Sequence, residues 1–145
     1  MITNERQYKI TRSEADRFRK AISLLASSQA ARTDVHPRLL QAEREAMESQ
    51  LADLQTELAE YERLKSADLS VITINSFNEF AAGLIKARIA SGLSQKALAE
   101  RLGLKEQQIQ RYEATSYAGV SIDRVQAVAN ALNLRINEVI TLEQE

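Results

Sequence analysis

The side chains best suited to specific polar recognition lie in the stretch GLSQKALAERLGLKEQQIQRYE, residues 92–113. Its second half is rich in carboxamide, guanidinium and carboxylate groups, which can form paired hydrogen bonds to planar partners. If residues 105–113 form a helix, Ile109 and Tyr112 fall on its inner face. The outer face then carries Lys105, Glu106, Gln107, Gln108 and Arg111, with Gln110 at its flank.

Gly103 interrupts the helical pattern of this stretch. Inside a continuous helix a glycine costs about 1 kcal/mol relative to alanine, whereas between two helices it supplies a left-handed turn that other residues resist. The sequence therefore predicts one helix over residues 95–102, a tight turn at Gly103 and a second helix over residues 105–113. Ser94 is a suitable N-cap for the first of these helices.

Further helices are predicted on both sides of this pair. Ser76 and Glu79 have capping-box spacing at the start of a helix through FNEFAAGLIKARIAS, which Gly92 ends. Ser121 is a suitable N-cap for IDRVQAVANAL, and Asn133 ends that helix because asparagine tolerates positive φ. The stretch RINEVITL then predicts a fifth short helix.

Five helices with a tight glycine turn between the second and third resemble the helix-turn-helix domain of the Cro and phage-repressor (XRE) family. The resemblance rests on GLSQKALAERLGLKEQQIQRYE followed by ANALNLRINEVI, and it covers residues 77–142. It implies a lambda-repressor-like domain whose 95–102 helix braces across the sugar-phosphate backbone while the 105–113 helix enters the major groove. The DNA-binding residues implied are Gln95 and Lys96 at phosphates, with Lys105, Glu106, Gln107, Gln108 and Arg111 on the second helix.

The side-chain types of the second helix suit such a role. Glutamine can pair bidentately with adenine, arginine can pair with guanine, and glutamate can accept from the cytosine amino group. Each good bidentate pair contributes about 1–3 kcal/mol of base discrimination. The resemblance also implies a structural salt bridge between Arg88 and Glu113, which would join the first and third helices of the domain.

The chain departs from the family pattern in three places. Lys105 stands where a serine or threonine usually caps the recognition helix, and its side chain cannot accept a backbone N–H. Ala114 and Thr115 replace the usual Asn-Gly-like turn after that helix. Glu106 repels phosphates unless it finds a donor. These departures predict DNA binding that is weak for one monomer and depends on dimerisation.

The N-terminal half predicts two helices. TRSEADRFRKAISLLA reads as a helix with Thr11 and Glu14 at capping-box spacing, and Pro37 suits the first turn of a longer helix that reaches about Lys65. Apolar residues follow the second helix in steps of four and three, which keeps one narrow seam facing a partner. We expect an antiparallel hairpin that a second copy completes as a bundle; the alternative is that the seam packs on the C-terminal domain. The predicted dimerisation residues are Met47, Leu51, Leu54, Leu58 and Tyr61.

Between the two halves, LSVITINS breaks the helical period with four strand-forming residues from Val71 to Ile74. It predicts a short strand or an extended linker. The expected organisation is therefore a helical hairpin over residues 1–68 for dimerisation or partner binding, a linker over 69–76, and a helix-turn-helix domain over 77–145.

Composition supports an all-α protein and argues against several functions. The 145 residues include only 4 glycines and 1 proline, and the chain contains no cysteine. His36 is the single histidine and has no cysteine or second histidine with which to share a metal ion, so we expect no metal site and no cofactor. Neither a phosphate-binding glycine loop nor a nucleophile elbow is found, so we do not expect an enzyme. No secretory signal or long apolar run is present, which favours a cytoplasmic protein without a membrane partner.

The charge balance gives little support for tight non-specific DNA binding. The formal net charge is -1, and residues 77–145 contain equal numbers of basic and acidic side chains. Three functional hypotheses follow. The first is a sequence-specific transcriptional repressor that reads a palindromic operator in double-stranded DNA as a homodimer. The second is an antitoxin of a type II toxin-antitoxin pair that binds a toxin protein and autorepresses its operon. The third is an interaction module that no longer binds DNA.

Overall fold

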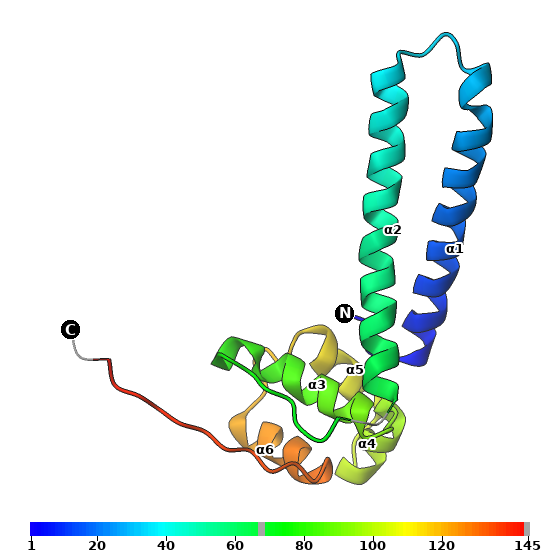
Figure 1. Cartoon of the computed structure of the whole chain (residues 1–145). Helices are drawn as coiled ribbons and strands as arrows, with labels where there is room; N and C mark the ends of the chain where they lie inside the picture. The colour runs from blue at the N-terminus through cyan, green and yellow to red at the C-terminus, as the bar shows by residue number, and fades with distance from the viewer. Residues whose placement is uncertain (67–68, 144–145) are drawn as a thin grey trace. The chain divides into compact units, whose positions relative to one another are not determined.

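The computed structural model describes residues 1–66 and 69–143 and divides the chain into two units, residues 1–68 and 69–145. The predicted end of the N-terminal domain, residue 68, lies outside the described residues. All regular secondary structure in the described ranges is helical, which confirms the all-α prediction (Figure 1). The elements are α1 Glu5–Ser28, η1 Gln29–Ala31, α2 Pro37–Lys65, η2 Phe77–Glu79, α3 Phe80–Ala90, α4 Gln95–Leu102, α5 Glu106–Ala114 and α6 Ile122–Ala131.

The first unit is an antiparallel hairpin of α1 and α2 (Figure 1). The N-cap of α1 is Asn4, whose side-chain oxygen accepts a hydrogen bond from the Gln7 N–H at 2.9 Å. The helix therefore begins before the predicted cap, and Thr11 and Glu14 lie in its interior. For α2 the prediction was accurate at both ends, because Pro37 occupies the first turn and the helix ends at Lys65.

Aromatic and polar contacts join the two helices near the start of α1 and the end of α2. The rings of Tyr8 and Tyr61 stack with their centroids 5.2 Å apart. The Tyr8 hydroxyl donates to Glu62 Oε1 at 2.5 Å, and Lys65 Nζ lies 3.0 Å from Glu5 Oε2. These contacts fix the register of the hairpin. Its buried apolar side chains include Ala15 and Leu25 on α1 and Leu40, Leu58, Tyr61 and Leu64 on α2.

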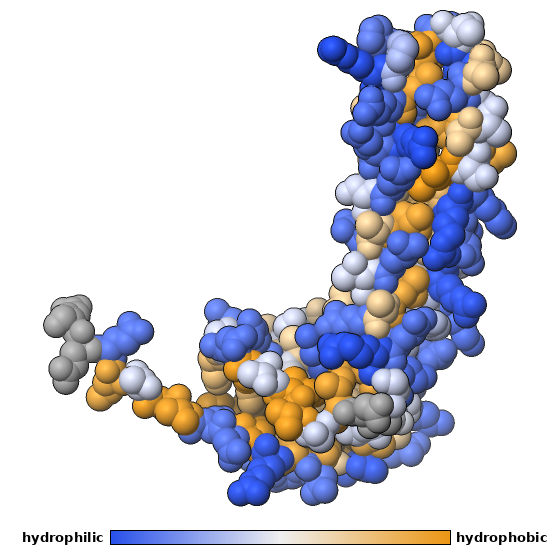
Figure 2. All heavy atoms as spheres, in the orientation of Figure 1, coloured by the Kyte–Doolittle hydropathy of each residue, from blue (hydrophilic) through white to orange (hydrophobic). Residues whose placement is uncertain are grey.

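The middle of the predicted seam is only partly covered. Leu58 and Tyr61 are buried, whereas Met47, Leu51 and Leu54 are half-buried. Figure 2 shows apolar side chains along the length of the hairpin, flanked by polar ones. Pairing with α1 therefore accounts for one end of the seam and leaves its central part accessible.

The second unit contains the predicted pair of helices around Gly103. Ser94 Oγ accepts a hydrogen bond from the Ala97 N–H at 3.0 Å and caps α4. Gly103 adopts φ +66°, and the Leu104 N–H donates to the Ala99 carbonyl at 2.9 Å, which closes the turn. The left-handed turn that the sequence predicts at Gly103 is thus present. Side chains of four helices meet in the core, where the largest fully buried ones are Ile85, Leu98, Ile109 and Val128.

The entry into the second unit differs from the prediction. Residues 71–74 form no strand; the extended-linker alternative describes them better, because the described part of the chain offers them no partner strand. Ser76 makes no side-chain cap, and Glu79 Oε2 instead accepts from the Asn75 N–H at 2.8 Å. A 3-10 turn, η2, therefore precedes α3.

The predicted fifth helix is wrong. Residues 134–143 are described and contain no helix. Asn133 has φ +55° and ends α6, as expected. The segment beyond it is rich in β-branched residues, which lose rotamer freedom in a helix and favour extended backbone. The domain thus has four α-helices and an extended C-terminal segment.

Candidate nucleic-acid interface

The outer face of α5 presents most of the predicted polar side chains to solvent. Lys105, Glu106, Gln107 and Arg111 are exposed. On the opposite side Ile109 is 0% exposed and anchors the helix in the core. The helix α5 thus has an exposed polar face and a buried apolar face that holds it in the domain. This arrangement meets the basic requirement for insertion of a helix into the major groove of DNA.

A buried ion pair fixes α5 to α3. Arg88 Nε donates to Glu113 Oε1 at 2.5 Å and Arg88 Nη2 donates to Glu113 Oε2 at 2.9 Å, which makes the pair bidentate. The third guanidinium nitrogen donates to the Leu93 carbonyl at 2.7 Å. The side chains of Arg88 and Glu113 are 3% and 1% exposed. The structural salt bridge implied by the resemblance is therefore present, and it holds α5 on the side of the helix that faces the core.

Gln95 also belongs to this network. It is 4% exposed, and its Nε2 donates to Glu113 Oε2 at 2.7 Å. The resemblance implied a phosphate contact for Gln95 at the start of α4, and in the structure its amide is bonded to the buried Glu113 carboxylate. The structure gives Gln95 a structural role, whereas its neighbour Lys96 is exposed.

Gln108 has a role that the sequence analysis did not assign to it. Its Oε1 accepts a hydrogen bond from the Lys105 N–H at 3.0 Å, while the Gln108 N–H donates to the Lys105 carbonyl at 2.9 Å. Gln108 thus supplies half of a capping box at the start of α5, where Lys105 provides no cap. The spacing between Lys105 and Gln108 was the available signal, and the polar outer-face pattern obscured it. Half of the carboxamide is committed to the backbone.

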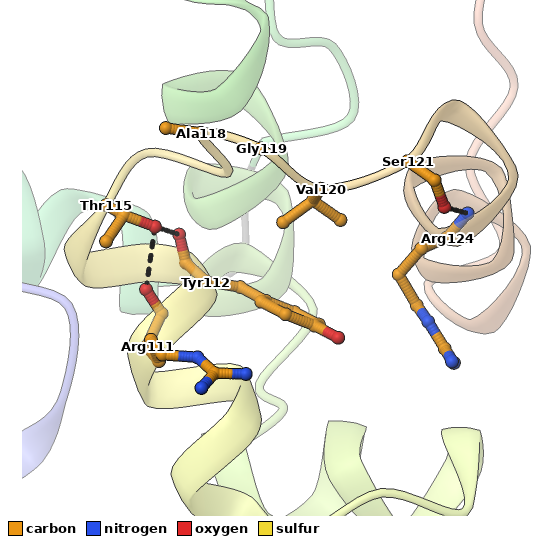
Figure 3. Close-up of a pocket in the computed structure, with 8 residues that line it drawn as sticks. All are labelled: Arg111, Tyr112, Thr115, Ala118, Gly119, Val120, Ser121 and Arg124. Atoms are coloured by element: carbon orange, nitrogen blue, oxygen red, sulfur yellow. Dashed lines mark hydrogen bonds between the residues drawn. The ribbon is translucent and has the colours of Figure 1, made fainter.

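A hollow of about 570 Å³ follows α5 and separates it from the start of α6 (Figure 3). Thr115 Oγ1 donates to the Arg111 carbonyl at 2.9 Å and closes the end of α5. Ser121 Oγ accepts from the Arg124 N–H at 3.2 Å and caps α6. The lining residues are Arg111, Tyr112, Thr115, Ala118, Gly119, Val120, Ser121 and Arg124.

Two guanidinium groups border this hollow, those of Arg111 and Arg124 (Figure 3). Within the described residues neither forms a salt bridge with a carboxylate. The sequence analysis missed Arg124; its position three residues after the Ser121 cap was the signal for its place in the first turn of α6. Asp123 is exposed in the same turn and partly offsets the positive charge.

The loop that forms the hollow is held by Tyr117. This residue is 8% exposed, and the centroid of its ring lies 5.9 Å from the ring centroid of Tyr112. Burial, and next the charge of Glu113, raise the pKa of the Tyr117 hydroxyl above its ordinary value. Ser116 and Tyr117 both have positive φ, at 52° and 58°, so the chain reverses here without the Asn-Gly-like pair of the family pattern.

Other kinds of site find no support among the described residues. They contain no group of three or more histidine, cysteine, aspartate or glutamate side chains that could hold a metal ion. None of the helices they form is long and apolar enough to cross a membrane.

Residues 84–139 match the protein-family model described as helix-turn-helix. The matched range begins inside α3, includes α4, the Gly103 corner, α5 and α6, and ends in the extended segment. Comparison with curated proteins and with solved structures gave no match.

Proposed function

We propose that this chain, which carries an XRE-type helix-turn-helix domain of a DNA-binding transcription regulator, is a repressor that reads the major groove of a palindromic operator as a homodimer. The observation that supports this proposal most directly is the two-sided character of α5. Its polar residues Gln107 and Arg111 are exposed, while Ile109 on the other side is completely buried. Rigid anchoring of this kind positions side chains for base contacts.

The exposed residues divide into two roles. Gln107 and Arg111 have planar groups that match adenine and guanine edges, and within the described residues neither side chain forms a hydrogen bond or salt bridge that DNA would have to break. Three other cations are suited to phosphate contacts. The ammonium groups of Lys96 and Lys105 carry charge without a planar pairing geometry, and Arg124 lies on α6, off the outer face of α5. Glu106 lies beside them and disfavours phosphates, so it is best placed opposite a cytosine amino group.

The hairpin is the proposed dimerisation element. Met47, Leu51 and Leu54 are half-buried along α2, and a second hairpin would cover them in a four-helix arrangement. Residues 77–145 have no net charge, so one domain gains little from long-range attraction to DNA. Two linked domains on two half-sites would compensate for this weakness.

The test of DNA recognition is selection of bound sequences from a random duplex library, followed by titration of the selected duplex. We expect a palindromic consensus, and we expect Gln107→Ala and Arg111→Ala to weaken binding and relax selection at different positions. Gln126→Ala is the matched control, because Gln126 is an exposed glutamine on α6, outside the proposed interface. Absence of any enriched sequence, or equal effects of all three variants, would contradict sequence-specific recognition.

Salt dependence provides a second measurement on the same duplex. With three phosphate-contacting cations per copy, a slope of about -0.9 per contact predicts that raising salt from 50 to 200 mM weakens a monomer about 40-fold and a dimer about 2,000-fold. A slope close to the monomer value for the wild-type chain would refute the dimeric mode of binding.

The test of the hairpin is the oligomeric state of the full chain by sedimentation equilibrium. Leu51→Glu places a charge in the half-buried seam and is expected to give a monomer with weak DNA binding. Gln55→Glu introduces the same side chain at an exposed position of α2 and should leave the dimer intact. A wild-type monomer, or dissociation by both variants, would exclude the seam as the dimer interface.

An antitoxin role is the second candidate. It is favoured by Leu24 and Leu39, which are 68% and 64% exposed near the connection between α1 and α2 and could contact another protein. Co-expression with the product of an adjacent gene tests it. A stable complex that is lost on Leu39→Ser, with DNA binding retained, would support a toxin partner. Absence of a complex would leave the lone repressor.

A further inference from the structure

We propose that residues 134–143 form an antiparallel two-stranded ribbon with the same residues of a second copy, centred on Val139. The ribbon would be a second contact between the DNA-binding domains of two chains, and it rests on the homodimer proposed above. Three features of this segment support the ribbon: its exposed apolar side chains, its unpaired backbone within the described residues, and the complementarity of its sequence with itself.

The segment carries apolar side chains that the rest of the described chain does not cover. Val139 and Ile140 are each 90% exposed, Leu142 is 87% exposed and Ile136 is 39% exposed. Figure 1 shows the chain leaving α6 as an extended segment without regular secondary structure, and Figure 2 shows apolar groups along it. Such a density of large exposed apolar side chains indicates a surface for interaction with another molecule.

The backbone of the segment is equally available. The last turn of α6 is closed by bonds from the Asn133 N–H to the Asn130 carbonyl and from the Leu134 N–H to the Ala129 carbonyl. Within the described residues, no backbone hydrogen bond involves the chain from residue 135 to residue 143. Extended, β-branched chain with free donors and acceptors is a template for a partner strand.

The order of the residues favours an identical partner strand. In an antiparallel pair centred on Val139, Val139 faces its own copy and Ile136 faces Leu142. Arg135 faces Glu143, which places opposite charges across the pair at both ends. Asn137 then faces Thr141, and no position opposes two like charges. A register shifted by two residues, centred on Glu138, would place two carboxylates face to face.

A two-stranded ribbon is marginally stable when isolated. Here the proposed hairpin dimer would keep two copies of the segment together at high effective concentration. The ribbon is therefore expected in the full-length dimer and not as an independent association of the domain.

Cysteine substitution provides the test, because the chain contains no native cysteine. In the ribbon, the two copies of residue 139 lie opposite each other, within reach of a disulfide. The two copies of residue 137 would be offset by four residues, or about 13 Å at 3.3 Å per residue, which is too far. The full-length variants are Val139→Cys, Asn137→Cys and Thr141→Cys, with Gln126→Cys as an exposed control on α6.

We expect Val139→Cys to form a disulfide-linked dimer about tenfold faster than Gln126→Cys under mild oxidation. Asn137→Cys and Thr141→Cys should each crosslink slowly alone and rapidly when the two variants are mixed. Equal rates at residues 137, 139 and 141 would show random collision of the segments and overturn the ribbon. A rate for Val139→Cys equal to that of the control would show that the segment binds elsewhere, for example on its own domain, and would also overturn it.

Sedimentation of the wild-type chain at the same concentration separates the two proposals. A dimer without rapid crosslinking at residue 139 would refute the ribbon alone. A monomer would refute the dimeric repressor on which the ribbon rests.

Discussion

The buried network of Arg88, Glu113 and Gln95 gives the sharpest prediction about this domain. Replacement of Arg88 by methionine keeps an unbranched side chain of similar length and removes every guanidinium donor. Glu113, whose side chain is 1% exposed, would then retain the Gln95 amide as its donor in the network. Removing one partner of a buried ion pair costs about 3–5 kcal/mol, because the remaining charge is left uncompensated.

Two further variants locate the origin of that cost. Gln95→Ala removes the hydrogen bond from its Nε2 to the Glu113 carboxylate and is expected to cost about 1.5–3 kcal/mol. Arg88→Met combined with Glu113→Leu removes both charges and should recover much of the stability lost in Arg88→Met, because no buried charge is then left unpaired. We expect the free energy of unfolding to be highest for the wild type, lower for Gln95→Ala and lowest for Arg88→Met. The double variant is expected to be more stable than Arg88→Met alone.

The assay is urea unfolding followed by circular dichroism, with hydrogen exchange of α3 and α5 amides to assign the transition of the second unit. If Arg88→Met lowers the free energy of unfolding by less than about 1 kcal/mol, the Arg88–Glu113 pair behaves as an exposed salt bridge, and a cost from an uncompensated buried charge is refuted. A double variant less stable than Arg88→Met would also contradict this origin of the cost. DNA affinity per folded molecule should be unchanged in Gln95→Ala, because its side chain is inside the domain.

Two other predictions concern α5 and the loop after it. Gln108→Ala removes the half capping box and should destabilise the domain by about 0.5–2 kcal/mol. Gln107→Ala, at the neighbouring exposed position, should leave the midpoint of urea unfolding unchanged. Equal midpoints for the two variants would refute the capping role of Gln108. The raised pKa of Tyr117 means that the unfolded chain releases this proton at lower pH than the folded one. The corresponding stability is present below pH 10 and is lost as pH rises above it; a Tyr117→Phe variant should lack this component, and identical alkaline unfolding of the two proteins would contradict it.

The helices whose boundaries depend on local signals were predictable. Pro37, Ser94, Gly103, Ser121 and Asn133 each act on the few residues around them, and the structure places all five where the sequence analysis expected them. The α2 seam also predicted its pairing with α1, because a narrow apolar stripe cannot be buried by one helix.

The errors arose where two local signals competed. Thr11 and Glu14 have capping-box spacing, but Asn4 caps α1 earlier and the helix simply continues through them. The segment after Asn133 has apolar spacing compatible with a helix, yet its β-branched residues favour extended chain. In both places the pattern was real, and another residue nearby determined the outcome.

For the proposed interface, the sequence predicted the outer face of α5 but could not separate the side chains that remain exposed from those that support the fold. Gln95, Gln107 and Gln108 carry the same side chain, and only their surroundings distinguish them. Gln95 reaches a buried carboxylate, Gln108 reaches a backbone N–H, and Gln107 remains exposed. Information of this kind depends on tertiary contacts, which a linear pattern does not contain.

This division limits what one copy can read. With Gln95 and Gln108 engaged in the fold, Gln107 and Arg111 are the principal candidates for bidentate base contacts. Two such contacts supply about 2–6 kcal/mol of discrimination, whereas specific binding typically exceeds non-specific binding by about 4–10 kcal/mol. A single domain therefore falls at the lower edge of that range. Two domains on a palindrome would double the number of contacts and reach about 4–12 kcal/mol, which covers that range and agrees with the homodimer proposed above.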